Sequence, residues 1–231
     1  MELRKLAAGL LMLALLPAGA ARADMAEEPE SASQEQTAEQ SAAGPKELIE
    51  QTANRVLESM EGRRDELRAK PQELYEIVDE ILLPHFDIEY AARLILARHW
   101  RRASEEQRER FQNAMYQSLV RTYADGLLDF TTEKMTVQDA RKERDGDRAT
   151  VPTQVVLDDG TRAPVDYILH MDDGQWKVFD VKIEGRSYVL NYRRQLENDI
   201  ERRGIETVIA DLEKDPEALE ALEPEQGQGQ R

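Results

Sequence analysis

Ser187 is the residue whose surroundings most resemble those of a catalytic nucleophile, because it lies between a strand-like and a helix-like pattern in Gly185-Arg186-Ser187-Tyr188-Val189. A nucleophile elbow holds its serine between two glycines, on a turn that leaves a parallel strand. Here Val189 stands where the second glycine is required, and the preceding strand belongs to an antiparallel pattern. The sequence therefore favours a helix N-cap, in which the Ser187 hydroxyl accepts a backbone N–H.

The sequence gives no stronger indication of a metal site or of an acid-base pair than it gives of a nucleophile. His85, His99 and His170 lie far apart without ligand spacing, and the chain has no cysteine. Acids such as Asp79, Glu80 and Asp166 could pair for acid-base work, but 47 acidic residues produce such pairs by chance. The Asp-Gly dipeptides lack the spaced oxygen ligands of a calcium loop, and no glycine-rich phosphate loop occurs. We expect neither a cofactor nor a metal, and no enzyme activity.

The two ends of the chain differ in composition from its middle. Residues 1–23 have a basic start, an apolar run and a small-residue site at Ala21-Arg22-Ala23, which predicts a cleaved export signal. Residues 24–45 are rich in Glu, Gln, Ser and Ala and predict a disordered acidic segment. Residues 215–231 predict a flexible tail. One folded domain is expected over residues 46–214.

The charge of the chain limits its partners. The formal net charge is −16 at pH 7, and residues 1–23 carry three basic residues and one acid, so the exported protein would be more acidic still. Such a surface repels nucleic acid and, without a local patch or a protein receptor, anionic membranes. We expect a soluble monomer that binds no nucleic acid.

Hydrophobic periodicity predicts an α+β domain. Helical spacing predicts helices over residues 46–60, 72–83 and 88–100, and then a long helix after a capping box formed by Ser104 and Gln107. The apolar stripe of this long helix repeats every four residues, at Phe111, Met115, Leu119, Tyr123 and Leu127.

After Phe130 the period changes to two, which predicts a four-stranded antiparallel meander. Its strands are expected over residues 134–144, 148–157, 161–171 and 175–184, with turns at Asp145-Gly146, Asp159-Gly160 and Asp173-Gly174. One face of this sheet is apolar, so helices must cover it. Two further helices are expected over residues 187–203 and 205–214, with a break at Gly204.

Two long motifs in this order resemble the periplasmic phospholipid-binding MlaC, or toluene-tolerance, family. They are RAKPQELYEIVDEILLPHFDIEYAARLILARHWRRASEEQRERF (68–111) and WKVFDVKIEGRSYVLNYRRQL (176–196). The similarity covers roughly residues 46–214. Ala97 stands where the family usually has glycine, His85 where it often has tyrosine, and Arg186 where it usually has a small apolar residue.

The resemblance implies a fold and a function. The fold would be a curved antiparallel sheet wrapped by helices, of the cystatin-like and nuclear transport factor-like type, with an apolar cavity between sheet and helices that holds phospholipid acyl chains. The protein would carry phospholipid through the periplasm between an outer-membrane lipoprotein and porin assembly and an inner-membrane ABC transporter bearing an MCE-domain protein. This transport maintains the lipid asymmetry of the outer membrane.

Candidate lipid-binding residues follow from the apolar faces assigned above. We expect about half of them to touch lipid, those of the strands most of all. They are Ile81, Phe86, Ile88, Leu94 and Ile95 on the early helices, Leu119, Tyr123 and Leu127 on the long helix, Val155, Val165, Tyr167, Leu169, Phe179, Val181 and Ile183 on the sheet, and Val189 and Tyr192 on the following helix.

Two other classes remain open from the residues alone. A periplasmic adaptor would have a filled, dry interior, because it needs only a stable scaffold. An enzyme with an unrecognised site would have polar groups that converge inside its cavity. From pattern alone, the apolar faces could simply pack against one another, because periodicity does not reveal a cavity.

Overall fold

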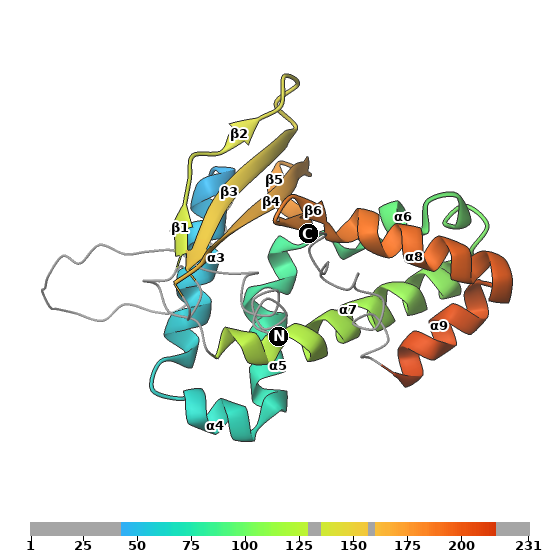
Figure 1. Cartoon of the computed structure of the whole chain (residues 1–231), viewed down its shortest axis with the longest axis horizontal. Coiled ribbons are helices and arrows are strands. Elements are labelled where there is room, and N and C mark those ends of the chain that lie inside the picture. Colours follow the sequence, from blue (N-terminus) through green and yellow to red (C-terminus); the bar gives the residue numbers. More distant parts are fainter. Residues whose placement is uncertain (1–42, 129–134, 157–159, 216–231) are drawn as a thin grey trace, which may run out of the picture.

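The computed structural model describes residues 43–128, 135–156 and 160–215. The segment expected as an export signal, and nearly all of those expected as the acidic segment and the tail, lie outside these residues. The described chain forms helices first, then an antiparallel sheet and then two more helices, so the expected α+β class is confirmed. Figure 1 shows the sheet on one side of the molecule, with helices α7, α8 and α9 extending away from it.

The sheet has the strand order β1-β3-β4-β5-β6, and β2 also pairs with β3. All of its pairings are antiparallel. The strands are β1 (Met135–Val137), β2 (Arg141–Lys142), β3 (Arg148–Val156), β4 (Arg162–Asp172), β5 (Gln175–Ile183) and β6 (Arg186–Ser187). The expected hairpin between β4 and β5 is present, and positive φ angles of 45° at Asp173 and 81° at Gly174 are those of a two-residue turn.

The first expected strand, over residues 134–144, is instead divided into β1 and β2. Val137 pairs with Thr153 and Arg141 with Thr150, so three residues lie opposite two. This is a one-residue irregularity of the bulge type. Pro152 lies at the same place on β3, and it has no N–H to donate to the neighbouring strand. Over the described residues the sheet therefore has six strands, two of them only two residues long, rather than the expected four.

The helices have the expected order, with one addition and one early end. They are α3 (Pro45–Met60), α4 (Arg64–Ala69), α5 (Pro71–Ile81), α6 (Ile88–Leu96), α7 (Glu105–Leu127), α8 (Tyr188–Arg203) and α9 (Ile205–Lys214), with 3₁₀ turns η1 (Leu83–His85) and η2 (Ala97–His99). The short helix α4 was not expected from periodicity. Within the described ranges, no helix is both long and apolar enough to cross a membrane.

Helix α6 ends at Leu96, four residues before the end predicted for it. Ala97 adopts φ 48° and ψ −114°, a backbone conformation that the Cβ atom of an L-residue disfavours and that only glycine adopts without cost. The chain then makes a short turn, in which the Trp100 carbonyl accepts a hydrogen bond of 2.9 Å from Arg108 Nε. The backbone conformation of Ala97 therefore ends helix α6, and the apolar period of α6 does not reveal this end.

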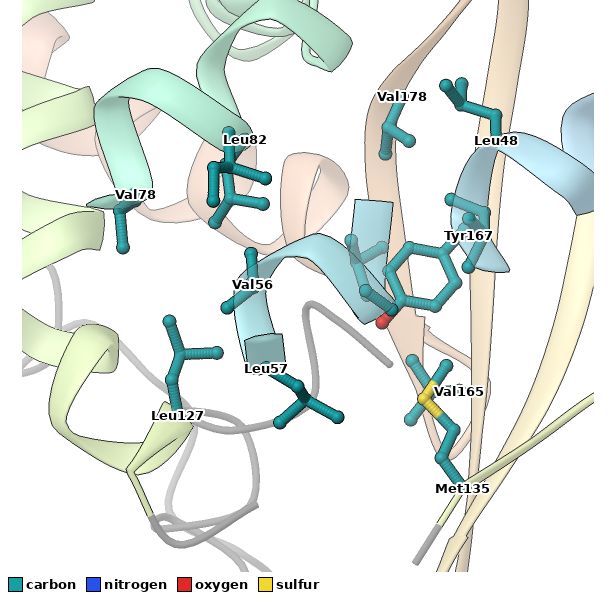
Figure 2. Packing of buried hydrophobic residues seen from close by; sticks show 14 of the residues in the cluster. Leu48, Val56, Leu57, Val78, Leu82, Leu127, Met135, Val165, Tyr167 and Val178 are labelled. Atoms are coloured by element: carbon teal, nitrogen blue, oxygen red, sulfur yellow. The ribbon is translucent and has the colours of Figure 1, made fainter. Parts of the chain in front are cut away.

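Two separate hydrophobic cores hold the molecule together. The first, here called the sheet core, lies between α3, α5, the end of α7 and one face of the sheet. Figure 2 shows Tyr167 and Val165 of β4 beside Leu48, Val56 and Leu57 of α3. The second, here called the helical core, lies between α6, α7, α8 and α9 and contains Phe111 and Ile209 at its centre. Helix α7 is long enough to contribute to both.

Ser187 begins helix α8 as its N-cap, as the sequence predicted. Its Oγ accepts the Leu190 N–H at 3.0 Å and donates to Asp180 Oδ2 at 2.6 Å. The capping box at α7 is also confirmed, since Ser104 and Gln107 exchange side-chain to backbone hydrogen bonds of 3.1 Å. The two caps differ in burial, because Ser187 is only 8% exposed whereas Ser104 is exposed.

Replacing Ser187 should therefore cost more than replacing Ser104. Ser104→Ala removes a solvent-exposed cap and should lower the free energy of unfolding by about 1 kcal/mol. Ser187→Ala removes a cap and also deprives the buried Asp180 carboxylate of a donor, for a total of about 2 kcal/mol. Urea unfolding followed by circular dichroism measures both values. An equal or smaller loss for Ser187→Ala would show that the Asp180 contact contributes nothing.

Candidate functional site

An apolar cavity of about 130 Å³ lies where the sheet core and the helical core meet. Its walls come from α5, η1, α6, α7, β5 and α8. Val78, Val120 and Val181 in these walls belong to the sheet core, whereas Met115 and Tyr192 belong to the helical core. An apolar cavity of comparable size stays dry and accepts a small apolar guest. The cavity therefore lies between the two cores rather than inside either one.

The cavity opens toward solvent at a rim of half-buried side chains. This rim includes the half-buried lining residues Leu83, Phe86, Leu119, Ile183 and Tyr188. Deeper lining residues such as Val178 and Val181 are buried. An apolar chain that enters between the rim residues would remain surrounded by apolar side chains along its path.

Ten of the seventeen residues proposed from the sequence line this cavity. These ten residues lie on the early helices, on the long helix, on strand β5 and on the helix that follows it, and none lies on β3 or β4. They are Phe86, Ile88, Ile95, Leu119, Leu127, Phe179, Val181, Ile183, Val189 and Tyr192. The four-residue stripe of α7 divides along its length, since Phe111 and Met115 belong to the helical core, Leu119 to the rim and Leu127 to the sheet core. The period therefore identified the right face of α7.

Six other proposed residues lie away from the cavity wall, and the seventh, Tyr123, has a side chain outside the described part of the structure. Val155, Val165, Tyr167 and Leu169 lie in the sheet core, and Val165 and Tyr167 face α3 in Figure 2. The remaining two are Ile81, buried in the sheet core, and Leu94, half-buried against the helical core. Alternation identifies the buried face of a strand, but it does not reveal whether a helix or a cavity covers that face.

Sequence reasoning missed twelve lining residues. They are Val78, Leu82, Leu83, Asp87, Ala91, Met115, Tyr116, Val120, Ala124, Val178, Asp180 and Tyr188. The apolar stripe predicted for the long helix already contained Met115. Val178 was not accessible to a strict alternation of two, because the pairing of β4 with β5 shifts register between Ile168 and Leu169 and adds a residue to β5.

Asp87 is one of the two carboxylates that line the cavity, and it joins α6 to the sheet. Its Oδ1 accepts the Tyr90 N–H at 2.7 Å as the N-cap of α6, and its Oδ2 lies 2.8 Å from His170 Nε2. Its backbone N–H donates to the Val178 carbonyl at 2.9 Å. The rings of Tyr90 and His170 stack with centroids 4.4 Å apart. Asp87 is therefore occupied in fixing the start of α6 against β4 and β5.

Asp180 is the second carboxylate, and it joins β5 to α8. Besides the Ser187 hydroxyl, it accepts the Val189 N–H at 3.0 Å on Oδ1. Burial raises the pKa of Asp180 above its ordinary value, while these hydrogen bonds act in the opposite direction. The Ser187 hydroxyl is thus engaged with a helix N-terminus and a carboxylate, which confirms its role as a cap.

Tyr116 carries a further polar group of the cavity wall. Its hydroxyl donates to the Asp79 carboxylate at the surface. Burial, and then this hydrogen bond, raise the pKa of the Tyr116 phenol, so the group stays protonated at neutral pH. Its ring therefore presents an apolar face to the cavity while its hydroxyl is satisfied outside it.

The histidines lie at three separate places. His170 contacts Asp87, whereas burial lowers the pKa of both His85 and His99. In the part of the chain that the structure describes, no three histidine, aspartate or glutamate side chains converge as metal ligands would. The two carboxylates of the cavity wall thus bind the protein's own helix ends, and the Tyr116 hydroxyl binds Asp79.

Two known proteins are similar to this chain in sequence. A toluene tolerance protein of Pseudomonas putida, ttg2D, is 29% identical over 161 residues, which are 69% of this chain and 74% of that protein. The intermembrane phospholipid transport system binding protein MlaC of Haemophilus influenzae is 23% identical over 173 residues, which are 72% and 79% of the two chains.

A solved structure has the same fold. It is the phospholipid-binding protein of Ralstonia solanacearum, determined in complex with a phospholipid. It superposes with a TM-score of 0.68 at 24% identity and covers 77% of this chain and 99% of its own. The model of the MlaC protein family matches residues 50–214, which include every wall of the cavity, the helical core and all of the sheet core except Leu48 and Ile49. The chain belongs to the MlaC protein family.

Proposed function

We propose that the protein is a periplasmic phospholipid carrier that holds acyl chains in the cavity between its two cores. The observation that carries this proposal is the apolar wall, in which the two carboxylates are already bound to helix ends. The MlaC family, the phospholipid transport system of the Haemophilus influenzae relative and the phospholipid complex of the Ralstonia solanacearum protein support it. The export signal expected at residues 1–23 accounts for delivery to the periplasm.

The energetics of acyl chains explain why a carrier is needed. Exposing two chains of about 14 methylenes each to water costs on the order of 20 kcal/mol, at about 0.8 kcal/mol per methylene. Unassisted diffusion of such a lipid between two membranes is therefore negligible. A carrier must offer comparable burial and still release its cargo, which suits an apolar wall with few fixed polar contacts.

Loading requires the two cores to move apart. A cavity of about 130 Å³ suits a guest of roughly the size of benzene, which is much smaller than a phospholipid acyl chain. The cavity lies along the boundary of the two cores, so it can widen if helices α6 and α8 of the helical core shift relative to the sheet core. Cargo enters by separating packed helices from β5, without any strand pairing having to break.

The proposed partners are those of a shuttle. We place the protein between an outer-membrane lipoprotein and porin assembly and an inner-membrane ABC transporter with an MCE-domain protein, where it contributes to outer-membrane lipid asymmetry. The intermembrane transport system named for the Haemophilus influenzae relative supports this placement. Energy for directed release would come from the ATPase of the transporter. A net charge of −16 suits a carrier that moves as a soluble monomer.

Purified protein should carry phospholipid in near-stoichiometric amount. Organic extraction of the native protein, followed by mass spectrometry of the extract, measures the lipid directly. A periplasmic adaptor with a filled interior would yield none. If the protein is reproducibly free of lipid and also takes up none from vesicles, the carrier proposal is wrong.

A charge inside the cavity should block loading without unfolding the protein. Leu119→Arg places a guanidinium at the rim, where the half-buried position lets its charged end reach water. We expect lipid uptake from vesicles to fall at least roughly tenfold, because acyl chains would have to desolvate the charge. The matched control is Leu190→Arg on α8, where the leucine is 53% exposed and lies outside the cavity wall. Normal loading of Leu119→Arg would contradict the placement of the acyl chains.

A further inference from the structure

The hairpin between β5 and β6 forms part of the rim of the cavity. Glu184 and Gly185 connect the two strands with φ angles of 51° and 76°, as a two-residue turn with two positive φ angles requires. Ile183 pairs with Arg186, and Lys182 pairs with Ser187. This register determines on which side of the hairpin each side chain lies.

Arg186 shares its side with Ile183. Directly opposed residues of an antiparallel pair place their side chains on the same face, with Cβ atoms about 5 Å apart. Ile183 lines the cavity and is half-buried, as are Leu119 and Tyr188. Ser187 lies on the other face, as its hydrogen bond to Asp180 shows. The exposed guanidinium of Arg186 therefore lies outside the rim, next to the side chains through which an acyl chain would enter.

The charge of Arg186 is available. Many arginines of the described chain form ion pairs, for example Arg98 with Glu197 and Arg110 with Glu213. In contrast, no ion pair or hydrogen bond found in residues 43–128, 135–156 and 160–215 involves the Arg186 side chain. The cavity wall itself supplies no arginine, lysine or histidine in these ranges. The N-terminus of α8 is also occupied, because Asp180 and Ser187 accept its first N–H groups.

We propose that Arg186 binds the phosphate of the lipid whose acyl chains occupy the cavity, an assignment that rests on the proposed function. A guanidinium offers a planar fork of donors that matches phosphate oxygens. A chain with a net charge of −16 otherwise repels an anionic group, so a local cation is needed where the phosphate emerges. Arg186 thereby gives the carrier a preference for phosphate-bearing diacyl lipids over diacylglycerol with the same chains.

The test is a competition between lipids that differ only in the head group. Delipidated full-length protein is incubated with vesicles of dioleoylphosphatidylcholine that contain dioleoylglycerol, and the bound lipids are quantified by mass spectrometry. We expect the wild type to enrich the phospholipid relative to the vesicle. Arg186→Gln should lose about threefold to tenfold of this enrichment while binding the same total lipid, as expected for one partly exposed charge-assisted contact.

The matched control is Arg193→Gln, which removes the same charge from an exposed position on α8 outside the cavity wall and should keep the enrichment. Enrichment that is equal in Arg186→Gln and the wild type would overturn the assignment of Arg186 while leaving the carrier function intact. A wild type that binds neither lipid would overturn both.

Free phosphate could occupy the same guanidinium, and a second arm separates the two sources. Replacing chloride by inorganic phosphate at constant ionic strength should leave the wild-type enrichment unchanged, because the acyl chains hold the lipid phosphate next to Arg186 at high local concentration. A loss of enrichment in phosphate buffer would mean that Arg186 is a site for free anions, and it would contradict the proposal.

Discussion

The burial of apolar surface along strand β5 is the interaction on which the other features of the molecule depend. Val178 and Val181 pack into the sheet core, while helix α8, which follows the same strand, packs into the helical core. Beyond its pairing with β4, β5 pairs among the described residues only with two residues of β6 and with Phe86 in a single bridge. Since no long strand of the described chain completes this edge, α6, α8 and η1 contact β5 there, and the cavity lies between β5 and helices α5, α6, α7 and α8.

Two carboxylates make this arrangement possible without leaving polar groups unsatisfied. Asp87 fixes the beginning of α6 to the sheet through His170 and Val178, and Asp180 fixes the beginning of α8 to β5 through Ser187. Each satisfies backbone N–H groups that the first turn of a helix would otherwise leave unpaired. The helices on either side of the cavity are thus held at their N-termini, while their apolar faces remain in contact only through packing.

Local chemistry made much of the fold predictable. The caps at Ser104 and Ser187, the hairpin turn at Asp173-Gly174 and the apolar stripe of α7 all depend on residues close in sequence, and the structure contains them. The division of the first strand opposite Pro152 depends on its partner strand, which the alternation of apolar residues does not encode. The end of α6 depends on the backbone conformation of Ala97, which the helical period does not encode.

The candidate site was predictable in part for the same reason. Helical and strand periods identify faces that must be buried, and ten cavity residues were found in this way. They do not identify the covering element, so Val165 and Tyr167 were grouped with the cavity although α3 covers them. Val178 escaped because the irregular register of β5 changes the alternation just where the strand meets the cavity.

The most direct test of the account is photo-crosslinking with a phospholipid that carries a photoreactive group near the end of one acyl chain. After loading and irradiation, mass spectrometry of peptides locates the attachment sites. The account predicts cross-links to cavity residues of β5, α7 and α8, such as Val181, Val120 and Tyr192. Cross-links that fall instead on α3 and on the faces of β3 and β4 that it covers would contradict it.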